Sequence, residues 1–189
     1  MNILYMGKYK KRFHAVILQI KNLPHGSTIL ELCFGDIYIA EFCNEAGYRW
    51  KGLDINNYFV QLAQRMGFDA QNKDVAKLEV LPKANVCVMM GSLYHFHPHS
   101  ETVLAKMLQA SENIVISEPV LNLSSKKGLI GFLAKRAANI GKGHEAFRYN
   151  KESFTAMIEG NRKQLGYEVE TIRENGKDMI VKLRRNENR

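Results

Sequence analysis

One segment constrains the fold of this chain more than any other; it runs from Thr28 to Asn44 and reads TILELCFGDIYIAEFCN. It opens with a short apolar run that predicts a buried strand, and it ends with residues that predict a helix from Asp36 to about Cys43. Gly35 stands at the turn between them, where glycine can adopt positive φ and lets a ligand approach the backbone. We expect Asp36 to cap the helix. The segment therefore predicts a strand, a tight turn and a helix.

Glu31 is the unusual residue of this segment, because it places a carboxylate inside an apolar strand. A buried carboxylate costs free energy unless a cation or a hydrogen-bond donor meets it. Two interpretations are open. Either a ligand with an ammonium group binds there, or Glu31 points to a surface edge or meets a lysine of the chain.

The rest of the chain continues the alternation of strand and helix. Further strands are predicted at 48–53, 68–71, 84–90, 113–117, 167–174 and 177–183. Helical spacing of apolar residues begins at 10–22, and Asn56, Ser100 and Asn150 are expected to cap three later helices. Asn175-Gly176 is a strong signal for a two-residue hairpin turn. This order predicts a doubly wound, mostly parallel seven-stranded α/β sheet with an antiparallel C-terminal hairpin at one edge.

Length and composition fit a single domain over residues 1–189, because 189 residues that are 46% hydrophobic suffice for one core. Cys33, Cys43 and Cys87 lie in apolar segments without metal-ligand spacing, so we expect free thiols in a cytoplasmic protein. The apolar run after the basic N-terminus has the character of neither a signal peptide nor a membrane span. Stable membrane insertion is therefore not expected.

The net charge of +8 is unevenly distributed. Residues 1–22, within a predicted basic N-terminal helix region at 1–26, carry basic residues and no acid, and so do residues 121–142. Residues 28–119 between them are net acidic. Two interpretations are open: the basic segments attract an anionic partner, or they are solvated faces.

Ligands of an open α/β sheet bind at the carboxyl ends of the strands, beside the point where the strand order reverses. Those ends carry Glu31 with Gly35, Asp54, Asp74, and Met90 with Gly91. An acid after the second strand can accept both hydroxyls of a ribose, and an acid after the third can accept from an adenine amino group. The pattern indicates an adenosine site with room for a cation.

From about Thr28 to Leu183 the chain resembles the class I S-adenosylmethionine-dependent methyltransferases. The resemblance is carried by ILELCFG at the first strand, GLDIN at the ribose motif, KDVAKLEVLP at the adenine motif, VMMGSLYHF at the fourth strand, and ISEP with GHEAFRYNKESF beyond it. The first motif departs from the family, since Cys33 and Ile37 replace two of three glycines and only Gly35 remains. A relative with weakened cofactor binding is therefore an open alternative. A nicotinamide site is disfavoured because G-x-G-x-x-G is absent.

The resemblance implies a Rossmann-like fold and methyl transfer from S-adenosylmethionine. The cofactor-binding residues that it implies are Glu31, Cys33, Gly35, Asp54, Ile55, Asp74, Val75, Met90 and Gly91. For the acceptor we expect Tyr94, His95 and Arg148 as binding residues, from their places just past the fourth strand and at the end of the segment 122–143. A hydroxyl or amine acceptor needs a general base, for which His95 and His144 are the candidates. A metal site at the histidines 95, 97 and 99 is disfavoured, because Pro98 intervenes and no acidic partner lies close by.

The acceptor is expected to be a small, anionic molecule that receives the methyl group on oxygen or nitrogen. Nucleic acid is disfavoured by the resemblance, because the [DNS]-PP-[YFW] motif that follows the fourth strand in family members methylating base amino groups is absent here. RNA methylation, and a degenerate relative that binds the cofactor without catalysis, are the alternatives. The segment 122–143 is expected to be a lid over the site; a fixed surface helix or a membrane-facing helix is the competing interpretation.

Overall fold

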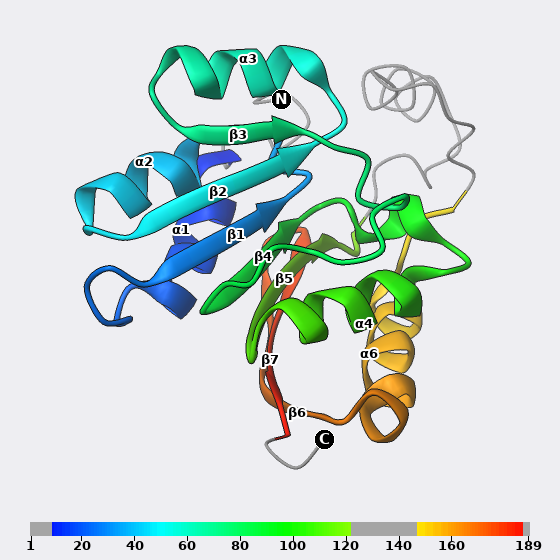
Figure 1. Ribbon diagram of the computed structural model, residues 1–189. Coiled ribbons are helices and arrows are strands. Elements are labelled where there is room, and N and C mark those ends of the chain that lie inside the picture. Colours follow the sequence, from blue (N-terminus) through cyan, green and yellow to red (C-terminus); the bar gives the residue numbers. More distant parts are fainter. Residues whose placement is uncertain (1–8, 122–146, 187–189) are drawn as a thin grey trace.

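The structure is a computed structural model that describes residues 9–121 and 147–186, and it contains a seven-stranded sheet (Figure 1). The strands are β1 (Thr28–Leu32), β2 (Arg49–Asp54), β3 (Asp69–Asn72), β4 (Val86–Met90), β5 (Asn113–Pro119), β6 (Tyr167–Asn175) and β7 (Asp178–Arg185). Their order is β3-β2-β1-β4-β5-β7-β6, with β1 to β5 parallel and β7 antiparallel to both of its neighbours. The predicted doubly wound sheet with its C-terminal hairpin is confirmed.

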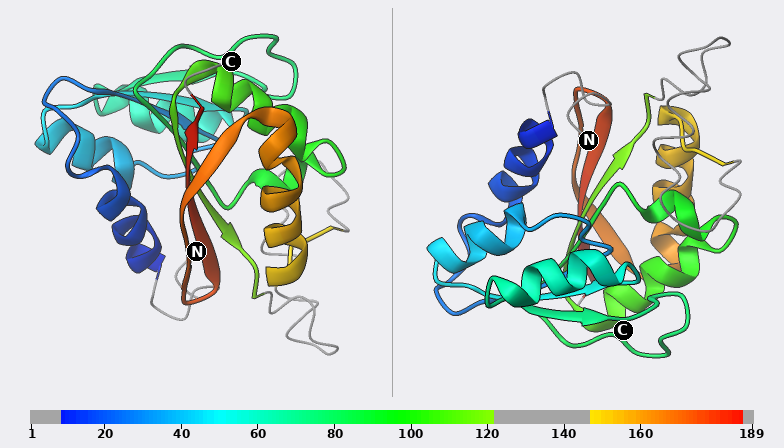
Figure 2. Two further views of the ribbon diagram at one scale, coloured as in Figure 1. Left: turned by 90° about the horizontal axis from the view of Figure 1, so that it is seen from below. Right: turned by 90° about the horizontal axis from the view of Figure 1, so that it is seen from above.

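Helices cover both faces of the sheet (Figure 2). They are α1 (Tyr9–Ile20), α2 (Tyr38–Glu45), α3 (Asn57–Arg65), the short 3-10 helix η1 (Leu93–Phe96), α4 (Ser100–Ala110) and α6 (Lys151–Leu165). The core on one face includes residues of α1, α2 and α3, and the core on the other includes residues of α4 and α6. The segment 122–143, proposed above as a lid, lies outside the described residues.

Strand β4 shows why the sequence gives this two-sided sheet. Its five residues, VCVMM, are all buried. Cys87 and Met89 enter the core beside α4, while Val86, Val88 and Met90 enter the core beside α1 and α2. A central parallel strand is covered on both faces, so both sets of alternating side chains must be apolar.

Two predicted helix caps are confirmed. The Asn56 side chain accepts from the backbone N–H of Tyr58 at 3.0 Å at the start of α3. Asn150 and Ser153 form a reciprocal capping box at the start of α6. Such caps satisfy N–H groups that have no partner inside the helix.

Three local predictions are wrong by one or two residues. Helix α2 begins after Ile37, and Asp36 accepts instead from the Tyr9 hydroxyl of α1 at 3.1 Å. Ser100 is the first residue of α4 rather than its cap, because its hydroxyl oxygen accepts a hydrogen bond from the Tyr149 hydroxyl at 2.8 Å. In the terminal hairpin Asn175 pairs with Asp178, so the two-residue turn is Gly176-Lys177 and not Asn175-Gly176.

Candidate functional site

The turn after β1 is held against the end of β2. The Cys33 N–H donates to the Leu53 carbonyl at 2.7 Å, and the Gly35 N–H donates to an Asp54 carboxylate oxygen at 3.1 Å. Both Cys33 (φ 53°) and Gly35 (φ 56°) lie in the left-handed region. Glycine suits that conformation, whereas it costs Cys33 about 1–2 kcal/mol because of its Cβ. The turn therefore keeps the shape of a glycine-rich turn although one glycine is replaced by cysteine.

Asp54 connects the turns that follow β1 and β2. Its second oxygen accepts from the Asn56 N–H at 2.7 Å, and burial raises the pKa of its carboxyl group in spite of the two backbone hydrogen bonds. An ionised carboxylate offers about four acceptor positions. The two bonds leave acceptor capacity on Asp54 for the hydroxyl groups of a ligand.

Glu31 is fully buried and lies on the sheet face that α1 and α2 cover. The Trp50 indole N–H donates to one carboxylate oxygen at 2.8 Å, and the other oxygen has no hydrogen-bond partner among the described residues. Burial raises the pKa of Glu31 well above its usual range. Glu31 is thus neither at a surface edge nor paired with a lysine within the described chain. The indole partner was not predicted.

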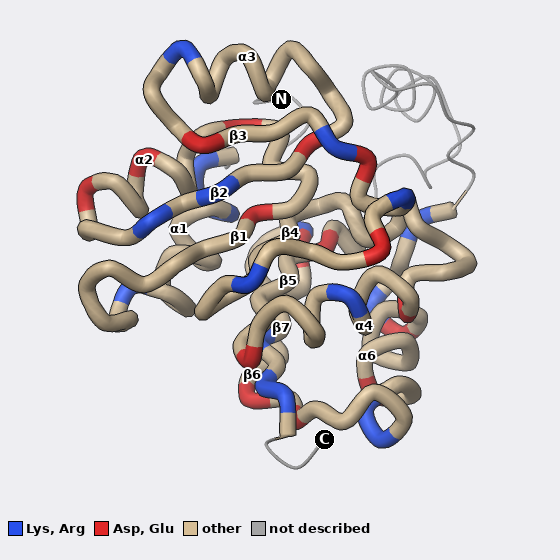
Figure 3. Tube along the Cα trace, viewed as in Figure 1, with Lys and Arg blue, Asp and Glu red and all other residues tan. Residues whose placement is uncertain are grey.

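Three acidic side chains lie close enough to Cys33 to affect its thiol. Burial is the main reason that the pKa of the Cys33 thiol is raised, and the charges of Asp54, Asp74 and Glu118 raise it further. These acids come from the end of β2, the loop after β3 and the end of β5, and Figure 3 shows acidic positions at the end of β2 and beyond β3. A cationic group beside Cys33 would be stabilised by this arrangement.

The predicted adenine-binding residues lie along the loops after β2 and β3. The half-buried Asp74 accepts from the Ala76 N–H at 3.0 Å, and Val75 is buried behind it. Ile55 is 67% exposed, which leaves an apolar side chain open for contact with a flat ring. Asn72 ties the two loops together through its side-chain amide, which donates to the Ile55 carbonyl at 2.9 Å. Asn72 was not among the predicted site residues.

Gly91, at the end of β4, needs glycine for two reasons. Its φ is 63°, and a Cβ there would lie 2.5 Å from a guanidinium nitrogen of Arg12. The Arg12 Nε–H donates to Asp178 at 2.9 Å, and both side chains are buried, as is Met90 beside Gly91. Arg12, within the basic segment 1–22, is therefore neither part of a solvated face nor available to an external anionic partner.

The three predicted acceptor residues come together beyond β4. The Arg148 guanidinium lies 3.6 Å from the centre of the Tyr94 ring, and the His95 ring centre lies 4.0 Å from that of Tyr94. His95 is exposed. The resulting cluster, Tyr94, His95 and Arg148, combines a cation with two rings. His144 lies outside the described residues.

The other two histidines of this region have different neighbours. His97 stacks on Phe147 at 3.6 Å between ring centres, and His99 lies 3.9 Å from Glu101. Within residues 9–121 and 147–186, no group of three or more His, Cys, Asp or Glu side chains is arranged to hold a metal ion.

Glu118, which belongs to the quoted sequence ISEP, was not among the predicted site residues. It is fully buried at the end of β5, and one oxygen accepts from the Leu93 N–H at 3.0 Å. The other oxygen has no hydrogen-bond partner in the described part of the chain. Burial raises the pKa of Glu118 to about 8. An acid that closes an apolar strand was the signal that could have identified it.

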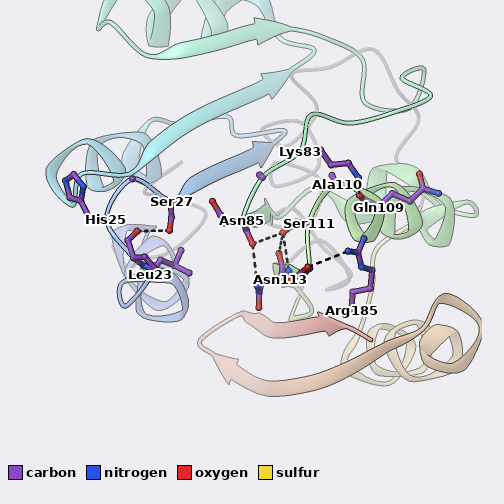
Figure 4. Close-up of a pocket in the computed structure, with 14 residues that line it drawn as sticks. Leu23, His25, Ser27, Lys83, Asn85, Gln109, Ala110, Ser111, Asn113 and Arg185 are labelled. Carbon is purple, nitrogen blue, oxygen red and sulfur yellow. Dashed lines mark hydrogen bonds and ion pairs between the residues drawn. The ribbon is translucent and has the colours of Figure 1, made fainter. Parts of the chain in front are cut away.

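A pocket of about 620 Å³ lies at the opposite, amino-terminal edge of the sheet (Figure 4). Two cationic side chains of the pocket donate to backbone carbonyls at the C-terminus of α4. The Lys83 ammonium donates to the Gln109 carbonyl at 2.6 Å, and Arg185 donates to the Leu108 carbonyl at 2.9 Å. The Ser111 hydroxyl is similarly bonded to the Asn85 carbonyl at 2.8 Å. These bonds stabilise the junction between α4 and the strands that border the pocket.

Comparison with known proteins gives a likeness at the level of the fold. No family model matches the chain, and no curated protein matches it. Among solved structures, magnesium protoporphyrin IX methyltransferase (ChlM) from Synechocystis PCC 6803 with bound SAH has a TM-score of 0.66 at 15% identity, covering 97% of this chain and 85% of that chain.

Two further structures extend this comparison. A chain of the complex between the Haloferax volcanii Trm112 methyltransferase activator and the putative methyltransferase has a TM-score of 0.68 at 11% identity, covering 95% of this chain and 92% of that one. An rRNA methylase from Escherichia coli has a TM-score of 0.63 at 12% identity, covering 95% and 65%. The chain has the fold of the class I S-adenosylmethionine-dependent methyltransferases.

None of the helices in residues 9–121 and 147–186 is long and apolar enough to cross a membrane.

Proposed function

We propose that this protein is a cytoplasmic S-adenosylmethionine-dependent methyltransferase that transfers the methyl group to oxygen or nitrogen of a small, anionic molecule. The observation that carries the proposal is the position of Asp54. A buried carboxylate with remaining acceptor capacity lies between the turns after β1 and β2, where this fold places a ligand. No cation pairs with Asp54 among the described residues, so ligand hydroxyls are suitable partners.

The residues at the carboxyl edge fit the parts of the cofactor. Asp54 would accept from the ribose hydroxyls, the exposed Ile55 would pack on the adenine ring, and Asp74 with the N–H of Val75 would meet its polar edge. Asp54 and Asp74 near Cys33 would favour the positive charge of the methionine part, and Glu118 would add to this effect when ionised. Bound at this edge, S-adenosylmethionine would supply an electrophilic methyl group on a positively charged sulfur.

The cluster of Tyr94, His95 and Arg148 would bind the acceptor. Arg148 would contribute positive charge toward an anionic group, while its guanidinium remains ordered by stacking on Tyr94. His95, or His144, would accept the proton that a hydroxyl or amine loses as its heteroatom gains the methyl group. Alignment of the acceptor and exclusion of water would provide most of the rate acceleration.

Arg12 bears on the choice between a small acceptor and RNA. Its charge is paired with the buried Asp178, so it does not add to a basic surface for phosphate groups. RNA methylation remains the second candidate because an rRNA methylase is among the proteins of similar fold. A gel shift at low salt distinguishes the two: tight RNA binding that weakens steeply as salt rises would favour RNA over a small molecule.

Isothermal titration calorimetry with S-adenosylmethionine and with S-adenosylhomocysteine tests the cofactor site. Heat of binding and a raised melting temperature are expected for both ligands. Absence of both effects at millimolar ligand would contradict the proposal and favour a degenerate relative. Screening pooled metabolites for release of S-adenosylhomocysteine then tests for an acceptor.

A further inference from the structure

The first backbone N–H groups of the short helix η1 donate to an acceptor that lies outside the helix. Its N-cap residue, Ser92, makes no side-chain capping bond to it. Instead, the Leu93 N–H donates to Glu118 of β5 at 3.0 Å, and a hydrogen bond from the Tyr94 N–H also lowers the pKa of Glu118. The first N–H groups of a helix have no partner within it, so an acceptor supplied by another strand fixes where the helix begins.

The helix η1 carries two members of the cluster proposed to bind the acceptor, Tyr94 and His95. A change in the position of the first turn of η1 would move both rings relative to Arg148, which belongs to a different segment. Glu118 itself is fully buried beneath this turn. Its carboxyl group can therefore affect the acceptor cluster through the backbone of η1 without contacting the acceptor.

We propose that Glu118 is a positioning residue, which holds the start of η1 and so orders Tyr94 and His95 for the acceptor, and that it holds η1 more firmly when ionised. This inference rests on the proposed function only where it concerns the acceptor. A carboxylate accepts stronger hydrogen bonds from N–H groups than a neutral carboxyl does. Ionisation of one buried side chain would thereby change the order of the acceptor cluster.

The groups around Glu118 place its ionisation near neutral pH. Burial raises its pKa to about 8, against the opposing effects of the two N–H groups and of Arg12. Asp178, at the start of the neighbouring strand β7, also raises the pKa of Glu118, while Arg12 directs its Nε–H to Asp178 rather than to Glu118. Cys33 and Tyr149 also lie close enough for their pKa values to respond to the charge of Glu118.

A titration of the ¹⁵N-labelled protein by NMR tests the proposal without any ligand. Between pH 6 and pH 9.5, the amide signals of Leu93 and Tyr94 should shift with a midpoint near the pKa of Glu118, about 8. The variant Glu118→Gln keeps the shape and an amide oxygen but cannot ionise, so this shift should disappear. The matched control is Glu112→Gln, the same change beside the other end of β5 at an exposed ion pair, which should leave the shift intact.

A second measurement concerns function. With S-adenosylmethionine and pooled metabolites, release of S-adenosylhomocysteine should rise more steeply from pH 6.5 to pH 9 in the wild type than in Glu118→Gln, while cofactor affinity stays equal. Equal pH profiles would overturn the functional part of the proposal.

The amide titration decides the structural part. A Leu93 signal that does not titrate in the wild type, or that titrates equally in Glu118→Gln, would overturn it. If Glu118→Gln fails to fold, the wild-type titration still decides. Failure of the proposed function would appear as absence of cofactor binding, which leaves the amide titration unaffected.

Discussion

The two edges of the sheet differ in how their charged side chains are paired. The amino-terminal edge has the pocket of about 620 Å³, but its Lys83 and Arg185 donate to the last carbonyls of α4. At the carboxyl edge and the face beneath it, Glu31, Glu118 and Asp178 each keep a buried oxygen without a hydrogen-bond partner within residues 9–121 and 147–186. Buried polar atoms are normally paired, so such exceptions require an explanation. The proposed site at the carboxyl edge is therefore supported by incomplete pairing of charge and not by the size of a hollow.

The helix geometry explains part of this difference. The C-terminus of α4 presents unpaired carbonyls at the amino-terminal edge, and cations there are stabilised by the helix dipole. At the carboxyl edge the donors reach only one oxygen of Glu118, through η1, and only one oxygen of Asp178, through Arg12 and Ser117. We therefore expect substitutions at the two edges to have unequal effects.

The largest effect is expected from Asp178→Ala, which leaves the buried Arg12 guanidinium without its carboxylate partner. Removing one partner of a buried ion pair costs about 3–5 kcal/mol in the free energy of unfolding. Urea denaturation would measure this loss. Asp69→Ala is the control, because Asp69 forms an exposed pair with Lys51 and should cost about 0–1 kcal/mol. Similar losses in the two variants would remove the distinction between buried and exposed charge in this protein.

Asp54→Ala is expected to weaken binding of S-adenosylmethionine by about 1–3 kcal/mol, tenfold or more, because it removes the acceptor of the ribose hydroxyls. It also removes the bonds to the N–H groups of Gly35 and Asn56, so the melting temperature should fall. Calorimetry measures the affinity. Glu112→Ala, at the amino-terminal edge, should leave it unchanged. Unchanged affinity in Asp54→Ala would place the cofactor site elsewhere.

Glu118 gives a prediction about stability and pH. Its pKa is raised from 4.5 to about 8 on folding, so between these values the folded state binds a proton that the unfolded state has lost. Its contribution to the free energy of unfolding is thus fully present below about pH 4.5 and is lost as pH rises to about 8, with a slope of at most about 1.4 kcal/mol per pH unit.

Glu118→Gln should remove this contribution. Urea denaturation at pH 5, 6.5 and 8 should therefore show a steeper loss of stability in the wild type than in the variant. Parallel curves would mean that Glu118 has an ordinary pKa in the folded protein and would weaken the contrast between the edges.

The fold could be predicted from the sequence because periodicity reports burial directly. The all-apolar β4 and the capping Asn56 and Asn150 express local rules that tertiary packing did not overrule. Asp36 and Ser100 were misassigned because each side chain bonds to a distant hydroxyl, that of Tyr9 or Tyr149. Such partners lie far away in the sequence, so local patterns cannot reveal them.

Distance along the sequence also explains which parts of the proposed site could be predicted and which could not. Asp54 could be identified because an acid at a strand end is a local signal. The indole partner of Glu31 and the pairing of Arg12 with Asp178 depend on strand order and on helix docking. Glu118 has a local signal, but its bond to η1 requires knowing that β5 lies beside β4.

The smallest effect is expected from Lys83→Met at the amino-terminal edge. This variant keeps an unbranched apolar stem but removes the ammonium group that donates to the Gln109 carbonyl at 2.6 Å. The loss should be about 0.3–1 kcal/mol, the usual value of a cation at a helix C-terminus, and it should shrink in high salt because the group is exposed. Urea denaturation at low and high salt measures the loss of stability and its dependence on salt.

Cofactor affinity by calorimetry should stay at the wild-type value, since Lys83 lies at the edge opposite to Asp54. A tenfold loss of cofactor affinity in Lys83→Met would show that the pocket at the amino-terminal edge communicates with the site, and the functional separation of the two edges would then be wrong.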